Sequence, residues 1–168
     1  MDEFEQLYIK YEKQIYKYLY YLSRDALTAE ELSQETFYRV FNSINSFKGN
    51  SKVSTWLFQI AKYTFYSYLK EKDKIQRLTD ISTFENPSSQ LDTPENIYDK
   101  KEEEIYIMNS IKKLKQSYQE IVILRIYNEL SFKEIGNIFN QSDTWARVNF
   151  YRAKNKLCSI MEANINDK

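Results

Sequence analysis

Residues 130–156 read LSFKEIGNIFNQSDTWARVNFYRAKNK, a segment that predicts two short helices with a tight turn between them. Ser131 followed by Glu134 three residues later is a capping-box pattern, so a helix should begin at Phe132. Gly136 has no side chain, which would let a second helix cross closely at that point. The apolar positions of the first helix recur at helical spacing and are Phe132, Ile135, Ile138 and Phe139.

A second helix should follow at once. Asn140 tolerates the left-handed conformation that ends a helix, and Ser142 or Asp143 can cap the next one. Its inward face would consist of Ala146, Phe150, Ala153 and Leu157. Between Thr144 and Leu157 there are four basic residues and no acidic one. Two short helices, a tight turn and a basic outer face predict a helix-turn-helix that places its second helix in the major groove of DNA.

The candidate contacts with duplex DNA lie at the start of this second helix and on its outer side. They are Ser142, Thr144, Trp145, Arg147, Val148, Tyr151, Arg152 and Lys154. The alternative is a helical hairpin whose basic stripe is merely solvated. The short turn, the glycine at the crossing point and the absence of acidic residues favour DNA binding.

The composition indicates a mostly helical chain with enough apolar residues for a core. Of its 168 residues 42% are hydrophobic, and only two are glycine and two proline. The formal net charge is zero, but acidic residues dominate 1–38 and 78–109, whereas lysine and arginine dominate 39–77 and 110–157. Two basic blocks indicate two contact surfaces for an anionic partner.

Several kinds of site are excluded by the residues that the chain lacks. It has no histidine, and Cys158 is its only cysteine, which removes Cys/His catalysis, histidine-dependent metal sites and intrachain disulfides. Glu30, Glu31 and Glu35 could suggest a carboxylate metal site, but the helical-bundle version needs a Glu-x-x-His pair. We therefore predict no catalytic residue, no metal, no cofactor and no small-molecule substrate, and a protein that is not an enzyme.

The sequence also predicts a cytoplasmic protein. Its first residues are acidic and lack the basic-then-apolar order of a signal peptide. No run approaches the roughly 18 apolar residues of a membrane span.

The front half of the chain predicts three amphipathic helices, over 3–22, from Thr28 to about Asn45, and over 52–71. Thr28 with Glu31 would form the capping box of the second. The third helix interleaves cations and aromatic rings on one face, namely Gln59, Lys62, Tyr63, Tyr66 and Lys70. Such a face suits single-stranded nucleic acid, because rings stack on unpaired bases and ammonium groups meet phosphates. Alternatively, these tyrosines extend the core.

The predicted fold class is all-α, with two small helical domains over 1–72 and 95–165. Residues 73–94 hold both prolines and no sustained period, which predicts a flexible linker. The end of the second domain, 162–168, should fray.

The second domain should begin with two further helices. Thr93-Pro94 is a cap followed by a first-turn proline, which would start a helix over 95–115. Ser117 and Glu120 would form another capping box, for a helix over 118–128.

Two blocks of the sequence resemble the extracytoplasmic-function (ECF) group of bacterial sigma-70-family transcription initiation factors. The block similar to region 2 of that family reads AEELSQETFYRVF at 29–41, FKG at 47–49, TWL at 55–57 and IA at 60–61. The block similar to region 4 reads YQEIVILR at 118–125, LSFKEIG at 130–136 and YRAK at 151–154. Both blocks, in this order and with a short linker, form a highly specific pattern.

The resemblance implies a factor that binds core RNA polymerase and directs it to promoter DNA. The helix that would dock on the β′ clamp coiled coil of polymerase carries Glu31, Leu32, Gln34, Glu35, Phe37 and Tyr38. Segment 47–70 would recognise and open the promoter near −10. The candidate contacts of this segment are chosen from its own cations, amides and aromatic rings and are Lys48, Asn50, Lys52, Gln59, Lys62, Tyr63, Tyr66 and Lys70. Helix 143–156 would read the −35 element, and Arg147, Tyr151 and Arg152 match family contact positions there.

The resemblance also implies an anti-sigma factor, which would cover these surfaces until a signal releases them and could hold the protein at the membrane. The chain departs from the family at Tyr63 and Ser67, where many members have Asn and Asp, so family contacts at these two positions are not carried over. Trp145 replaces a commonly small residue, and Asn140 replaces the usual turn glycine.

Two rival functions remain open on the sequence, beside a third and weakest one, a hydrolase or metal enzyme, which the lack of histidine and of a convincing catalytic pair disfavours. One is a repressor or activator that binds duplex DNA without polymerase, although the chain shows no clear dimerisation segment. The other is an adaptor that uses its acidic helix to bind another protein.

Overall fold

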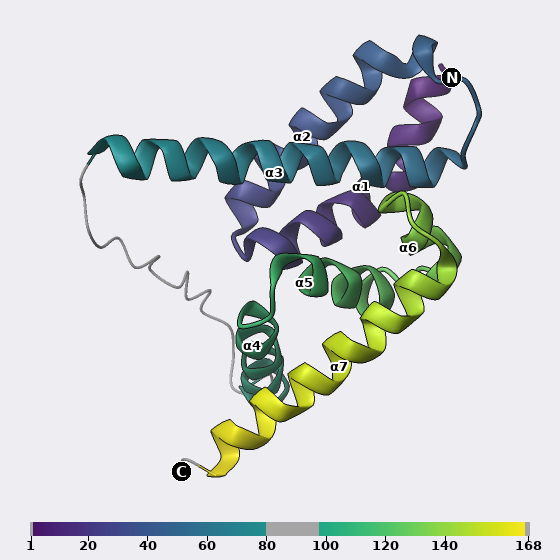
Figure 1. Ribbon diagram of the computed structural model, residues 1–168. Coiled ribbons are helices and arrows are strands. Elements are labelled where there is room, and N and C mark those ends of the chain that lie inside the picture. Colours follow the sequence, from purple (N-terminus) through teal and green to yellow (C-terminus); the bar gives the residue numbers. More distant parts are fainter. Residues whose placement is uncertain (1, 80–97, 167–168) are drawn as a thin grey trace. The chain divides into compact units, whose positions relative to one another are not determined.

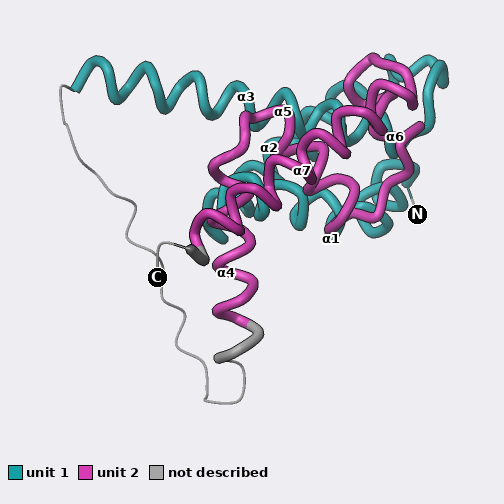
Figure 2. Tube along the Cα trace, turned by 60° about the horizontal axis from the view of Figure 1, so that its bottom comes forward, with its two compact units in different colours: residues 1–91 teal, residues 92–168 magenta. Residues whose placement is uncertain are grey.

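The computed structural model describes residues 2–79 and 98–166, and every regular element in those ranges is helical (Figure 1). The chain divides into two compact units, residues 1–91 and residues 92–168 (Figure 2). The prediction of an all-α fold with two small helical domains is confirmed.

Unit 1 contains the helices α1 (Glu3–Ser23), α2 (Ala26–Ser43) and α3 (Val53–Thr79), with a 3-10 turn over Ile44–Ser46. Each of the three helices packs against the other two. The rings of Tyr18 in α1 and Phe58 in α3 meet edge to face, with 5.5 Å between centroids. The apolar side of each helix supplies the core, which includes Ile15, Tyr18, Leu19, Ala29, Val40, Leu57, Phe58, Ala61 and Phe65.

The start of α2 differs from the prediction, because Asp25 and not Thr28 is its N-cap. The Asp25 carboxylate accepts a hydrogen bond from the Thr28 backbone N–H at 2.8 Å and another from the Thr28 hydroxyl at 2.7 Å. Thr28 is therefore inside the first turn, and the capping box with Glu31 was wrong. An aspartate three residues before the threonine provides the same local cap with a charged acceptor.

Helix α3 is longer than predicted. It continues to Thr79, so residues 73–79, which the sequence assigned to the linker, are helical. This stretch is rich in Lys, Gln, Arg and other residues that a helix accepts, and it contains no glycine or proline to end the helix. The predicted cap at Thr93-Pro94 lies outside the described residues.

Unit 2 contains the helices α4 (Tyr98–Lys112), α5 (Gln116–Val122), α6 (Phe132–Ile138) and α7 (Asp143–Asn166), with a π-helical turn over Ile123–Tyr127. Helix α7 packs against each of the other three helices. Part of the core is formed by Ile111 and Leu114 from α4 and the loop after it, Val122 from α5, and Ala153 from α7.

Two predictions for this unit were wrong. The capping box of Ser117 and Glu120 does not form, because the N-cap of α5 is Lys115 and no side chain caps this helix. Glu120 is fully buried, and its Oε1 accepts a hydrogen bond from Gln116 Nε2 at 3.3 Å. The end of α7 is helical as far as Asn166, within the range 162–168 that was predicted to fray, and residues 167–168 lie outside the described ones. It is held by the Tyr106 hydroxyl, which donates to the Met161 carbonyl oxygen at 2.8 Å.

Candidate nucleic-acid interfaces and protein-docking face

The start of α6 forms as predicted. The hydroxyl of Ser131 accepts a hydrogen bond from the Glu134 backbone N–H at 3.1 Å, and the Glu134 carboxylate accepts one from the Ser131 N–H at 2.9 Å. These two bonds satisfy donors that the helix start would otherwise leave without partners. The capping box is confirmed.

The turn between α6 and α7 is closed by short-range contacts. Asn140 has a φ of 54°, the left-handed conformation predicted for it. The Ser142 hydroxyl accepts a hydrogen bond from the Trp145 N–H at 3.0 Å, which identifies Ser142 as the cap of α7. A Cβ atom on Gly136 would lie 2.6 Å from the Ser142 carbonyl oxygen. The predicted close approach at Gly136 is therefore confirmed. The group that comes close is the backbone of the turn, and not the second helix crossing there.

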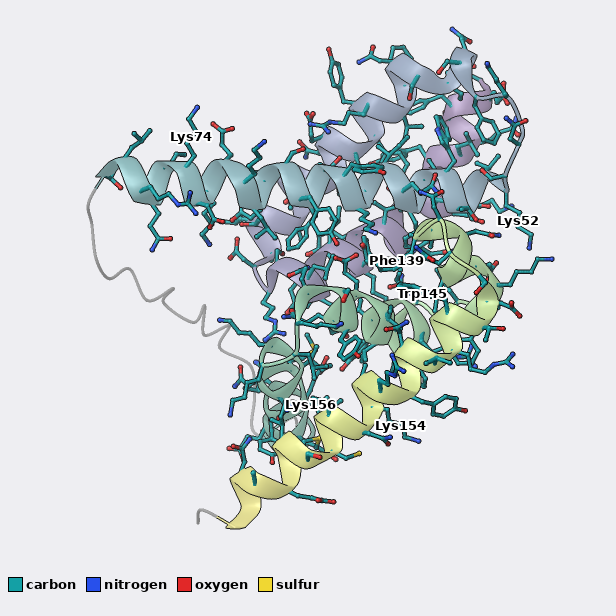
Figure 3. The ribbon with its side chains drawn as sticks, in the orientation of Figure 1. Lys52, Lys74, Phe139, Trp145, Lys154 and Lys156 are labelled. Carbon is teal, nitrogen blue, oxygen red and sulfur yellow. The ribbon has the colours of Figure 1, made fainter. Side chains whose placement is uncertain are left out.

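Helix α7 has the inward and outward faces expected of a recognition helix. Ala146 and Ala153 are fully buried, and Phe150 and Leu157 are half-buried. Seven of the eight predicted DNA contacts have exposed side chains, namely Ser142, Thr144, Arg147, Val148, Tyr151, Arg152 and Lys154. The exposed Lys154 and Lys156 lie further along the same helix (Figure 3).

Trp145 differs from the other predicted contacts. Its side chain is half-buried, and its ring packs on Phe139 of the turn with 5.2 Å between centroids (Figure 3). The aromatic pair joins the end of α6 to the start of α7. Trp145 thus has a structural partner in addition to any contact with DNA.

A cluster around Phe132 was not predicted from the sequence. The guanidinium carbon of Arg125 lies 4.6 Å from the centre of the Phe132 ring, and that of Arg147 lies 5.5 Å from it. Arg125 precedes the helix-turn-helix, and its Nη1 also donates to the Leu130 carbonyl oxygen at 2.9 Å. Arg125 reaches this ring only through the fold of the chain. The one available signal in the sequence was that Arg125 lies just before the LSFKEIG block, which contains Phe132.

The predicted −10 contacts in unit 1 lie before α3 and along it. Lys48, Asn50 and Lys52 are exposed, as are Tyr63 and Lys70, whereas Gln59, Lys62 and Tyr66 are half-buried. The Lys62 ammonium lies 5.5 Å from the centre of the Tyr66 ring. Tyr63 is 59% exposed, so this ring does not extend the core. The helix therefore presents cations and aromatic rings together.

The outer side of α2 carries a polar face. Glu31, Gln34, Glu35 and Tyr38 are exposed, and Glu35 Oε1 accepts a hydrogen bond from Arg39 Nε at 2.7 Å. Both Leu32 and Phe37 are buried in unit 1, as the helical spacing of apolar residues predicts, although the resemblance also counts them among the docking residues. The Leu32 side chain lies in the core, and the Phe37 ring packs edge to face against that of Tyr8, with 4.8 Å between centroids.

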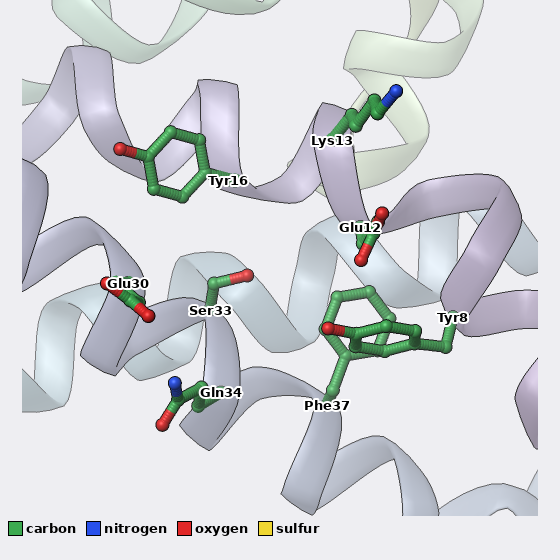
Figure 4. Close-up of a pocket in the computed structure, with 8 residues that line it drawn as sticks. All are labelled: Tyr8, Glu12, Lys13, Tyr16, Glu30, Ser33, Gln34 and Phe37. Carbon is green, nitrogen blue, oxygen red and sulfur yellow. The ribbon is translucent and has the colours of Figure 1, made fainter.

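A groove of about 440 Å³ lies between α1 and α2, beside this polar face (Figure 4). It is lined by Tyr8, Glu12, Lys13, Tyr16, Glu30, Ser33, Gln34 and Phe37. The hydrogen bond from the Tyr8 hydroxyl to Glu12, with partial burial and the charge of Glu12, raises the pKa of Tyr8 above its usual value. The groove combines aromatic walls with carboxylates, a combination that suits a cationic side chain.

Other kinds of site find no support in the described part of the chain. Its residues hold no group of three or more acidic or cysteine side chains placed to bind a metal. Cys158 is exposed, without a disulfide. Among the helices described, none has the length and apolar character needed to cross a bilayer.

The chain is similar in sequence to known proteins over nearly its whole length. Residues 7–75 match the sequence model of Sigma-70 region 2. The chain is 33% identical over 157 residues to RNA polymerase sigma factor YlaC of Bacillus subtilis (strain 168), covering 93% of this chain and 90% of that protein. It is 29% identical over 167 residues to ECF RNA polymerase sigma factor SigM of the same organism, covering 98% of each chain.

A solved structure shows the same fold. It contains the sigma factor RpoE in complex with the anti-sigma factor NepR from Bartonella quintana. The TM-score is 0.73 at 19% sequence identity, and the match covers 96% of this chain and 98% of that one.

Proposed function

The chain belongs to the ECF group of sigma-70-family RNA polymerase sigma factors, and on that premise we propose how its surfaces share the work of transcription initiation. A sigma factor binds core RNA polymerase and directs it to promoter DNA. Three surfaces are available for this work: the outer side of α7, the aromatic and basic face of α3, and the polar face of α2. Its place of action is the cytoplasm, because bacterial polymerase and chromosome are there.

The proposed reader of the −35 element is α7. The observation that carries this proposal is the Ser142-capped helix with Ala146 and Ala153 fully buried beneath a side that exposes Arg147 and Arg152. Arginine can bind guanine edges bidentately or clamp phosphates. Since phosphate contacts release counterions, binding of this helix to DNA should weaken steeply as salt rises.

The proposed −10 surface is the segment from Lys48 to Lys70. Its exposed cations would meet the phosphates of the separated strand, and Tyr63 would stack on an unpaired base. Each of the two DNA surfaces can be weak alone. When one polymerase holds both surfaces at a fixed spacing, binding of one surface raises the effective concentration of the other at its DNA site. The pair therefore binds a two-part promoter more specifically than either surface alone.

The proposed polymerase-docking face consists of Glu31, Gln34, Glu35 and Tyr38 on α2, which are all exposed. The adjoining groove, with Glu12 and Glu30 in its lining, would extend this face toward basic side chains of the β′ clamp. The relative RpoE is solved with an anti-sigma factor. We propose that an anti-sigma factor likewise controls this chain by covering its docking surfaces.

The decisive experiment is run-off transcription from a genomic library with purified core polymerase and the full-length chain. We expect initiation at a discrete set of promoters, and Arg147→Ala with Arg152→Ala should abolish it while the exposed Lys112→Ala on α4 leaves it intact. A chain that footprints alone and leaves polymerase unchanged would be a repressor or activator. Unaltered output from the double arginine variant would favour an adaptor.

A further inference from the structure

The Phe132 ring lies close to two arginines, one from the segment that precedes the helix-turn-helix and one from the helix that would read DNA. Arg125 precedes the helix-turn-helix, and its guanidinium carbon is 4.6 Å from the ring centre while its Nη1 donates to the Leu130 carbonyl. The guanidinium carbon of Arg147 in α7 lies 5.5 Å from the same ring centre. Both distances are within the reach of a cation–π interaction.

The ring is also fixed by its aromatic neighbours. Its centroid lies 5.5 Å from that of Phe150 and 6.4 Å from that of Tyr151, both in α7. Phe132 itself is half-buried, so part of the ring is covered by this packing and part remains at the surface. A ring held in this way offers Arg147 a fixed face, although Arg147 is exposed to solvent.

An exposed arginine samples many rotamers, and ordering them on binding reduces affinity. A guanidinium that rests on an aromatic face before binding has less freedom to lose. We propose that Phe132 is a positioning residue for promoter recognition, which holds the guanidinium of Arg147 ready for the −35 duplex. This inference rests on the proposed function, because it requires α7 to read DNA.

The test is a double-mutant cycle on the polymerase holoenzyme containing the full-length chain. The probe is one duplex promoter fragment, chosen from those that the wild-type holoenzyme selects in the run-off experiment. Phe132→Leu, which keeps an apolar side chain without a ring face, should weaken promoter binding by about two- to fivefold. Phe132→Tyr should restore it. In an Arg147→Ala background, Phe132→Leu should have almost no further effect.

A matched control is the same cycle with Arg152→Ala. Arg152 is exposed on α7 like Arg147, but five residues further on, so it points to a different side of the helix. Phe132→Leu should keep its full effect in that background. A merely structural role for the ring would weaken promoter binding equally in all backgrounds, and this result would overturn the inference.

Failure of the proposed function gives a different result. If the wild-type chain directs polymerase to no promoter, that function is wrong and the positioning role falls with it. If the wild-type holoenzyme initiates normally and the cycle with Arg147 is additive, only the positioning role is wrong.

Discussion

The carbonyl oxygen of Ser142 lies so close to Gly136 that a Cβ atom added there would be 2.6 Å from it. Because the obstacle is backbone and not the end of a flexible side chain, Gly136→Ala must displace the turn. We expect a loss of about 1–3 kcal/mol in the free energy of unfolding, measured by urea titration. Asn140→Gly is the control in the same turn, since glycine keeps the left-handed conformation, and it should cost much less. Equal stabilities for Gly136→Ala and wild type would contradict the close packing.

Asp25 should make the stability of the protein depend on pH. Its hydrogen bonds with the Thr28 side chain and backbone lower the pKa of Asp25 below its usual value, and the charge of Lys72 adds to this. A carboxylate whose pKa is lower in the folded state stabilises fully above its unfolded pKa of about 4. This stabilisation decreases as the pH falls below about 4, and it is gone once the pH is below the pKa of Asp25 in the folded protein. Replacing Asp25 by Ala should cost about 1 kcal/mol at neutral pH.

Asp25→Asn separates the cap from its titration. Asparagine caps helices about as well as aspartate but carries no proton equilibrium in this range. The variant should remain near wild-type stability at pH 7 and lose less than wild type between pH 5 and about 3, as followed by urea unfolding at each pH. Parallel acid curves for Asp25→Asn and wild type would rule out this role for the carboxylate.

Glu31 provides a test of polymerase docking, because it is exposed and its replacement should not disturb the core. Glu31→Lys should weaken association with core polymerase by roughly 1 kcal/mol or more, about fivefold to tenfold, and the loss should shrink as salt rises. Fluorescence anisotropy of the labelled chain measures this. Glu103→Lys on α4, also exposed, is the matched control. Indistinguishable affinities for the two variants would remove the proposed role of α2.

Tyr63 tests strand capture. Its ring is 59% exposed, so Tyr63→Leu should leave stability nearly unchanged but remove a stacked base worth about 1–3 kcal/mol. Holoenzyme binding to a fork-junction promoter with an unpaired −10 strand should weaken accordingly, while binding to the closed duplex is spared. Tyr63→Phe should behave as wild type. Ile75→Ala, at an exposed apolar position later on α3, should also have no effect. Equal losses on both DNA forms would exclude stacking.

Tyr106 tests how the end of α7 is held. Tyr106→Phe removes the 2.8 Å hydrogen bond to the Met161 carbonyl, which should cost about 0.5–1.5 kcal/mol. Amide hydrogen exchange should accelerate in the last turns of α7 before it changes elsewhere in unit 2. Tyr118→Phe is the control in the same unit. Unchanged protection of these turns would show that apolar packing alone holds them.

The features predicted correctly depend on residues close together in the chain. The capping box of Ser131 and Glu134, the left-handed Asn140 and the alternation of buried Ala146 and exposed Arg147 all involve neighbours within a few positions. Local hydrogen bonds and helical periodicity are sufficient to specify them. The family followed from short motifs of this same kind.

Local patterns therefore predict a helical chain with a helix-turn-helix, and one inward and one outward face on each helix. The packing of the helices against one another is what buries Glu120 in the core and brings Arg125 to Phe132. The reason is physical: whether a side chain is buried or paired depends on which elements pack over it. Those contacts join residues distant in sequence, and no local pattern records them.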